Sequence, residues 1–306
     1  MSAPSSSSPR AVIFGCRGQL GVELVREFES RGYDVTGFGR TSVDITDRER
    51  IEHSLASIDP QVVLNAAAYN QVDVAEREPQ AALAANALGV RNLALACRQI
   101  DAAFVHFSTD YVFDGTLGRA YVETDTPHPL GAYAVSKLTG ELYAQAYLNN
   151  PLIIRTCGVF GPAGTRTARG NFIETMLRLS RTTQPIRVVE DHVASPTYAP
   201  WMAQRTADLV ERRASGVIHL GGGHPVSWFA FARMIFDAAG LHPTLVATSE
   251  REYRTEARRP KYSALSNSRM ESLGIAPMGP LDEAIRDYLR LREAVSASVA
   301  MPTRRE

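Results

Sequence analysis

The chain has 306 residues, in which 33 lysines and arginines balance 33 aspartates and glutamates, and 44% of the residues are apolar. This composition is typical of a folded globular protein rather than a disordered one, and a net charge of zero argues against a nucleic-acid partner. No apolar run reaches about 18 residues, so we expect no membrane-spanning helix.

The cysteines and the N-terminus indicate a cytoplasmic protein. Cys16, Cys97 and Cys157 are widely spaced and form no Cys-x-x-Cys pair, which argues against a disulfide framework and a structural zinc site. Residues 1–10 are low in complexity and lack the apolar core of a signal peptide. We expect them to form a disordered tail.

From residue 11 onward, short apolar runs alternate with longer helical patterns. This alternation is typical of a parallel sheet with helices on both faces. We expect strands at 11–14, 34–38, 62–65, 103–107 and 152–155. We expect helices at 22–31, 47–57, 78–99 and 132–148, where apolar residues recur every three or four positions. The pattern predicts an α/β fold with a Rossmann-type doubly wound parallel sheet.

After residue 160 the alternation becomes irregular and prolines are frequent, which indicates a second, smaller lobe. A helix at 201–213 and a strand at 216–220 look like returns to the sheet, so the two units are interleaved. We therefore assign 11–160 to a dinucleotide-binding domain with returns near 187–220. Residues 161–186 and 221–295 form a substrate-binding lobe, whose core includes Trp228, and 296–306 form a tail.

Three glycines, Gly15, Gly18 and Gly21, directly follow the first expected strand and open a helix. Glycines let such a turn tighten and let a pyrophosphate approach the backbone N–H groups at the positive end of the helix. The spacing differs from the Gly-x-Gly-x-x-Gly fingerprint, and a simple tight turn is the alternative interpretation. The position after the first strand favours a dinucleotide site.

The second strand ends at Gly39-Arg40, without the carboxylate that would hold the ribose hydroxyls of NAD. Arg40 and Arg17 offer cations to the 2′-phosphate of NADP instead. We therefore expect NADPH as the cofactor, with NADH as the alternative. Two arginines that simply face solvent would explain the same pattern.

Tyr133 and Lys137 lie four positions apart in a helical pattern and therefore project from one face of the helix. An ammonium group near a phenol moves the pKa of the phenol toward neutrality, so that the tyrosine can exchange a proton with a carbonyl oxygen. Thr109, at the end of the fourth strand, can reach the same oxygen. The alternatives are a solvated helix face for the pair and a turn cap for Thr109.

Several stretches together resemble one family. They are Gly15-Cys-Arg-Gly-Gln-Leu-Gly21, Val43-Asp-Ile-Thr-Asp47, Asn65-Ala-Ala-Ala-Tyr-Asn-Gln-Val-Asp73 with Ala75-Glu76 and Glu78-Pro79, Ser108-Thr-Asp-Tyr-Val-Phe-Asp-Gly115, Tyr133 with Lys137, Gly170-Asn-Phe172 and Arg259-Pro-Lys-Tyr-Ser263. They cover nearly the whole chain. They resemble the extended short-chain dehydrogenase/reductases and, within them, the dTDP-4-dehydrorhamnose reductase family.

The resemblance implies reduction at C4 of dTDP-4-dehydro-β-L-rhamnose, which gives dTDP-β-L-rhamnose in the last step of its synthesis. It makes Thr109, Tyr133 and Lys137 the catalytic triad. It places the cofactor beside Gly18, Gln19 and Leu20 at the pyrophosphate, Asp44 and Ile45 at the adenine, and Ala67, Ala68 and Tyr69 at its middle. It places the sugar nucleotide beside Val72, Thr109, Asp110, Tyr111 and Asn171.

The same residues argue against two relatives. Sugar-nucleotide dehydratases carry Asp-Glu after the threonine because elimination of water needs an acid and a base, whereas this chain has Asp110-Tyr111. Epimerases of the superfamily commonly retain NAD and carry an acidic residue where this chain has Arg40. Net reduction is therefore favoured over internal redox chemistry.

Two departures from the family pattern qualify the resemblance. Where the reductases usually read Thr-Ser-Trp-Val, this chain has Thr156-Cys-Gly158-Val159, which removes an aromatic wall expected beside the deoxysugar. The second lobe also lacks an obvious carboxylate cluster of the kind through which some family members bind Mg²⁺ between subunits. We expect no metal requirement, and either a monomer or a homodimer.

Two alternative functions stay open. The absence of this tryptophan favours a 4-ketoreductase that acts on another dTDP-deoxysugar. The other is a non-catalytic NADP-binding regulatory subunit, of the kind found with eukaryotic methionine adenosyltransferase; the joint presence of Thr109, Tyr133 and Lys137 argues against it.

Overall fold

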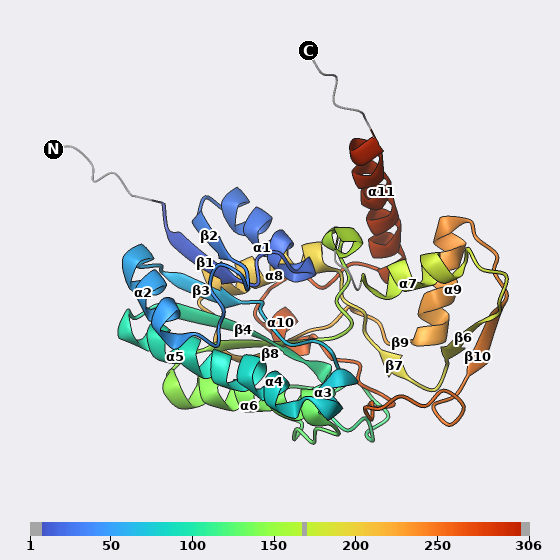
Figure 1. The fold of residues 1–306 in the computed structure, drawn as a ribbon, viewed down its shortest axis with the longest axis horizontal. Coiled ribbons are helices and arrows are strands. Elements are labelled where there is room, and N and C mark those ends of the chain that lie inside the picture. The colour runs from blue at the N-terminus through green and yellow to red at the C-terminus, as the bar shows by residue number, and fades with distance from the viewer. Residues whose placement is uncertain (1–7, 167–169, 301–306) are drawn as a thin grey trace, which may run out of the picture.

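The computed structural model describes residues 8–166 and 170–300. Six parallel strands form the main sheet in the order β2-β1-β3-β4-β5-β8 (Figure 1). Their bounds are β1 Arg10–Phe14, β2 Asp34–Phe38, β3 Val62–Asn65, β4 Ala103–Thr109, β5 Leu152–Thr156 and β8 Gly216–Leu220. The sheet confirms the predicted doubly wound α/β fold. The strand order changes direction between β1 and β3, and such a switch point opens a crevice at the carboxyl ends of the strands.

Both faces of the sheet are buried, as the apolar runs predict. Successive residues of β1 point to opposite faces: Ala11 and Ile13 join one core cluster, and Val12 and Phe14 join the other. One face is covered by α1 (Gln19–Ser30) and α8 (Ala199–Glu211). The other is covered by α2 (Arg48–Ile58), α5 (Gly89–Gln99) and α6 (Ala132–Tyr147).

The helix expected at 78–99 is interrupted. It consists of α4 (Pro79–Leu83), a π-helical turn at Ala84–Leu88 and then α5, and the short α3 (Val74–Arg77) precedes it. The π-helical turn lies where the chain approaches α6 closely, because a Cβ atom on Gly140 would lie 2.2 Å from the carbonyl oxygen of Asn86. Local π-helical turns of this kind are frequent at functional sites.

The second lobe has its own core and two small sheets. In one, β6 (Ile186–Val189) pairs in parallel with β10 (Leu245–Thr248); in the other, β7 (Val193–Ala194) pairs antiparallel with β9 (Val226–Ser227). Its helices are α7 (Phe172–Leu179), α9 (Trp228–Ala239) and α11 (Leu281–Ala300). The short α10 (Ser268–Ser272) lies near β8 instead. None of the helices within 8–166 and 170–300 is long and apolar enough to cross a membrane.

The structure refines the expected division of the chain. The return to the sheet begins with α8 and ends with β8, whereas residues 186–189 pair with β10 in the second lobe. The expected tails are shorter, because Arg10 already belongs to β1 and α11 extends to Ala300. Residues 1–7 and 301–306 lie outside the described residues, and the assignment of the lobes to cofactor and substrate stays a prediction.

Candidate active site

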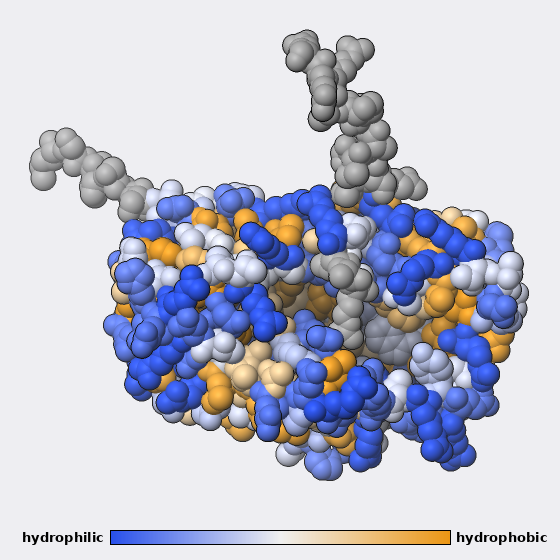
Figure 2. All heavy atoms as spheres, in the orientation of Figure 1, coloured by the Kyte–Doolittle hydropathy of each residue, from blue (hydrophilic) through white to orange (hydrophobic). Residues whose placement is uncertain are grey.

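The candidate site is a cavity of about 560 Å³ at the carboxyl ends of the sheet strands. Its lining comes from the glycine loop, the ends of β3, β4 and β5, the helix α6, and residues of α7 and α9 in the second lobe. Figure 2 shows the surface hollowed between the two lobes. The cavity therefore occupies the position where open α/β sheets bind ligands.

The glycine loop packs too tightly for side chains. Gly15 has φ +76°, and a Cβ atom there would lie 2.5 Å from the backbone nitrogen of Ala67. A Cβ atom on Gly21 would lie 2.1 Å from the carbonyl oxygen of Gly15. Helix α1 begins after Gly18, with no side-chain cap and no acidic residue in its first turn. Its N-terminal N–H groups can therefore hold a pyrophosphate.

Arg17 and Arg40 lie on either side of Gly39, at the end of β2. A Cβ atom on Gly39 would lie 3.4 Å from Cδ of Arg17, so the glycine makes room for this side chain. The Arg40 side chain is 89% exposed, and its Nε lies 3.2 Å from Oδ2 of Asp44. Two arginines beside the end of the second strand provide the positive charge that a 2′-phosphate requires.

The other predicted cofactor residues divide into two groups. Those that line the cavity are Gly18, Gln19, Leu20, Ala67, Ala68, Tyr133 and Lys137. Ile45 is buried in the core, where its side chain packs against Gly89, and its expected place beside the adenine stays a prediction. Tyr69 instead donates a hydrogen bond from its hydroxyl to Glu78 at 3.1 Å.

Thr109, Tyr133 and Lys137 all line the cavity, as the sequence predicts. Thr109 ends β4 and lies close to the phenol of Tyr133, which belongs to the first turn of α6. One turn later, Nζ of Lys137 donates a hydrogen bond to the carbonyl oxygen of Phe107 at 2.5 Å. The fold thus brings together three polar groups that lie on two separate elements.

Burial decides the electrostatics of these groups. It raises the pKa of Tyr133 above that of a free phenol, and the hydrogen bond with Thr109 opposes the rise only in part. Burial also lowers the pKa of Lys137 to about 8, although the carboxylate of Glu141 acts in the opposite direction. Burial is thus the largest effect on the pKa of Tyr133, and the expected action of Lys137 on this phenol stays a prediction.

Asp110 is a buried carboxyl group directly beside the triad. Its Oδ1 accepts a hydrogen bond from the Thr109 hydroxyl at 3.0 Å. Burial raises the pKa of Asp110 to about 6, against the opposing effect of hydrogen bonds from Ser263, Cys157 and Thr109. This carboxyl group can thus orient the Thr109 hydroxyl.

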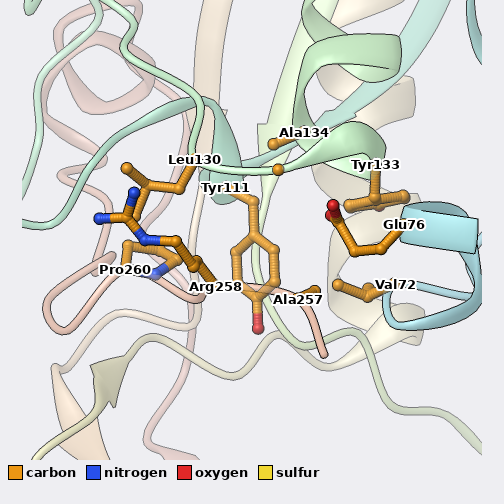
Figure 3. Close-up of a pocket in the computed structure, with 10 residues that line it drawn as sticks. Val72, Glu76, Tyr111, Leu130, Tyr133, Ala134, Ala257, Arg258 and Pro260 are labelled. Carbon is orange, nitrogen blue, oxygen red and sulfur yellow. The ribbon is translucent and has the colours of Figure 1, made fainter. Parts of the chain in front are cut away.

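Tyr111 extends the site into a smaller neighbouring pocket. In Figure 3 its ring lies at the centre, with Arg258 and Pro260 on one side and Val72 and Tyr133 on the other. The rings of Tyr111 and Tyr133 meet edge to face, with 6.2 Å between their centroids. The predicted substrate residues Val72 and Tyr111 therefore line the same small pocket as Tyr133.

Asn171 lines the cavity, and its side chain also makes several contacts within the protein. Its Oδ1 accepts a hydrogen bond from the backbone of Glu174 at 3.0 Å and so caps α7. Its Nδ2 lies 2.9 Å from Oε1 of Gln19 and 3.2 Å from the hydroxyl of Tyr288. This residue joins the second lobe to the glycine loop.

Sequence reasoning did not assign a role to Glu76, which caps the helix that carries Tyr133. Helix α6 begins after Gly131, a residue without a capping side chain. Instead, Oε1 of Glu76 accepts a hydrogen bond from the backbone N–H of Ala132 at 2.8 Å. A carboxylate at a helix N-terminus also interacts favourably with the helix dipole. The Ala75-Glu76 stretch is among the motifs that carry the family resemblance, but only the fold shows the hydrogen-bond partner of Glu76.

Trp228 packs against the core of the second lobe, as the sequence predicts, but it has a further contact that sequence reasoning missed. Its ring does pack against Phe231, with 6.1 Å between centroids. However, Trp228 also lines the cavity, together with Phe172 and Gly158. Helical spacing identified its buried neighbours but not the cavity on its other side.

No group of three or more His, Cys, Asp and Glu side chains within the described ranges could hold a metal ion. The predicted absence of a Mg²⁺ requirement stays a prediction.

A family model described as the RmlD substrate binding domain matches residues 10–293. The chain is 36% identical over 285 residues to the spore coat polysaccharide biosynthesis protein SpsK of Bacillus subtilis, a match that covers 93% of this chain and 98% of that protein. It is also 36% identical over 282 residues to a dTDP-4-dehydrorhamnose reductase of Aggregatibacter actinomycetemcomitans, covering 88% and 94%. The chain belongs to the dTDP-4-dehydrorhamnose reductase family.

A solved structure of this reductase family has the same fold. It is a dTDP-4-dehydrorhamnose reductase from Bacillus anthracis in complex with NADP, with a TM-score of 0.88 and 32% sequence identity. The match covers 92% of this chain and 99% of that chain. Both lobes of the present fold are therefore features of the reductase family.

The cap on α6 gives a testable prediction. Glu76→Ala removes the acceptor for the Ala132 N–H and should lower the free energy of unfolding by about 0.5–2 kcal/mol. Because Tyr133 lies in the same helical turn, kcat should fall as well. Urea denaturation and steady-state kinetics measure the two effects. Glu76→Gln retains an acceptor oxygen and is the matched control. If Glu76→Gln lowers the free energy of unfolding as much as Glu76→Ala does, capping is not the cause.

Proposed function

We propose that this protein is an NADPH-dependent reductase that converts dTDP-4-dehydro-β-L-rhamnose to dTDP-β-L-rhamnose. The observation that carries the proposal is the convergence of Thr109, Tyr133 and Lys137 on one cavity beside the glycine loop. The family membership and the reductase relatives support it. In this reaction the C4 ketone receives a hydride at carbon and a proton at oxygen.

The residues present fit a dinucleotide with a 2′-phosphate. Gly15 and Gly21 leave no room for side chains, so the backbone can approach a pyrophosphate closely. Gly18, Gln19 and Leu20 form the start of α1 and would hold that pyrophosphate, while Ala67 and Ala68 would line the middle of the cofactor. Bound NADPH supplies the hydride.

The phenol of Tyr133 is the proton donor in this proposal. Its raised pKa keeps it protonated at neutral pH, which is the state that an acid must have before it acts. Thr109 lies beside this phenol and donates a hydrogen bond to Asp110, so its oxygen is held near the place where the ketone oxygen would lie. Lys137 would donate hydrogen bonds to the nicotinamide ribose, and its charge would favour the phenolate left after proton transfer.

The sugar nucleotide is proposed to lie on the side of the cavity formed by Val72, Asp110, Tyr111 and Asn171. Val72 and Tyr111 flank Tyr133 in the smaller pocket, which brings this side close to the proton donor. Asp110 and Asn171 line the main cavity from the sheet and from the second lobe. A substrate that contacts both elements would be held across the cleft.

For one part of the proposal, the identity of the sugar, the sequence also supports an alternative. Gly158 replaces the aromatic residue expected at this position, which favours a 4-ketoreductase for a differently configured dTDP-deoxysugar as the second candidate. A non-catalytic regulatory subunit is disfavoured because all three triad side chains reach the cavity. A cytoplasmic location, and a monomeric or homodimeric state, remain part of the proposal.

Tyr133→Phe tests the proposed chemistry. Loss of the proton donor should lower kcat by roughly 10²- to 10⁴-fold, while NADPH affinity changes little. The assay follows NADPH absorbance with dTDP-4-dehydrorhamnose supplied by coupled upstream enzymes, and NADPH binding is measured separately by calorimetry. A Tyr133→Phe variant with undiminished turnover would exclude Tyr133 as the donor. Wild type that binds NADPH but turns over only another 4-keto sugar would support the second candidate.

The lowered pKa of Lys137 predicts an alkaline limit to activity. Lys137 loses its proton near pH 8, below the ordinary range for lysine, and its neutral form has lost the charge that holds the ribose. We expect kcat/KM for NADPH to fall above about pH 8. A profile that stays level to about pH 9.5 would contradict the assignment.

Arg40→Ala tests the recognition of the 2′-phosphate. Loss of a charge-assisted contact should lower kcat/KM for NADPH by roughly tenfold or more and leave the value for NADH nearly unchanged. Arg48→Ala is the matched control, because Arg48 is also an exposed arginine that pairs with a nearby carboxylate, Glu52. Equal losses with both cofactors would show that Arg40 does not read the phosphate.

A further inference from the structure

Gly158 is an exposed residue of the cavity wall, two positions beyond the end of β5. It has φ +47°, and a Cβ atom there would lie 3.1 Å from Cη2 of Trp228 and 3.5 Å from Cα of Pro196. Both its backbone conformation and its surroundings therefore disfavour a side chain. The space that a larger residue would need is already occupied by the edge of the Trp228 indole.

Trp228 is held firmly in place by the second lobe. It is the first residue of α9, which Ser227 caps by accepting a hydrogen bond from the N–H of Ala230 at 3.1 Å. The backbone N–H of Trp228 itself donates to the carbonyl oxygen of His192 at 3.2 Å. Its ring packs against Phe172, with 4.8 Å between centroids, and both rings line the cavity. The indole is thus a fixed aromatic surface.

This surface lies near the reacting groups. In the register of the sheet Thr156 pairs with Thr109, and Gly158 follows Thr156 by two residues. Cys157, between them, lies close to Asp110. The contact between Gly158 and Trp228 therefore places the indole at the triad end of the cavity.

We propose that Trp228 is a specificity-determining residue whose indole packs against the sugar ring of the dTDP-deoxysugar and holds C4 toward Tyr133. The proposal rests on the proposed function. A 6-deoxysugar presents C–H groups and a methyl group, which carry partial positive charge and match the negative face of an aromatic ring. The second lobe thereby supplies the aromatic wall that the sequence of β5 lacks.

A comparison of two ligands tests this proposal. In the presence of NADP⁺, calorimetry measures the dissociation constants of dTDP and of dTDP-β-L-rhamnose, which differ only in the sugar. Trp228→Ala should raise the dissociation constant of dTDP-rhamnose about tenfold and leave that of dTDP nearly unchanged. Trp228→Phe should retain most of the affinity for dTDP-rhamnose. Trp201→Phe is the matched control, because Trp201 packs against Tyr198 and Gly279 instead.

Fluorescence provides a second measurement that does not depend on a truncated side chain. The chain has two tryptophans, so Trp201→Phe leaves Trp228 as the only one that emits. Addition of dTDP-rhamnose to this variant should change the emission more than dTDP does. The emission of Trp228→Phe, which reports Trp201 alone, should respond to neither ligand.

The outcomes separate this proposal from the proposed function. Equal weakening of dTDP and dTDP-rhamnose in Trp228→Ala, or no weakening of either, overturns the contact with the sugar even if wild type is an active reductase. Wild type that binds NADPH but neither dTDP ligand, and that reduces no 4-keto sugar, overturns the proposed function as well. If Trp228→Ala does not fold, Trp228→Phe and the emission of Trp201→Phe still decide the matter.

Discussion

A buried ion pair fixes the helix of the candidate site to the sheet. Nη2 of Arg155, on β5, lies 2.7 Å from Oε2 of Glu141, on α6, and both side chains are at most 4% exposed. The hydroxyl of Ser108, on β4, donates to the same carboxylate. Charges buried in this way must stay paired, because breaking such a pair is strongly destabilising. One interaction therefore joins the strand that ends in Thr109, its neighbour β5 and the helix that carries Tyr133 and Lys137.

The sequence predicts the sheet well because each strand signal is local. In the sequence, strands buried on both faces are short continuous apolar runs. The tightly packed glycine loop is marked by three glycines between the first strand and the first helix. The pairing of Tyr133 with Lys137 is likewise a matter of spacing on one helix. Each of these features depends on residues that are close together in the sequence.

Features that depend on distant pairs could not be predicted. The partner of Glu76 is 56 residues away in the chain, and the π-helical turn that contains Asn86 meets Gly140 of another helix. The pKa of Tyr133 depends on burial by the whole fold, which spacing cannot report. Trp228 illustrates the same limit. The periodicity of the sequence indicates an apolar face on α9, but it does not indicate that Trp228, at the start of this helix, lines the cavity.

The contact between Gln19 and Asn171 ties the two lobes together. Gln19 belongs to the loop that would hold the pyrophosphate, and its Oε1 lies 2.9 Å from Nδ2 of Asn171, the residue that caps α7 in the second lobe. Both side chains border the same cavity, so a group that enters from either lobe meets an amide already hydrogen-bonded to the other lobe.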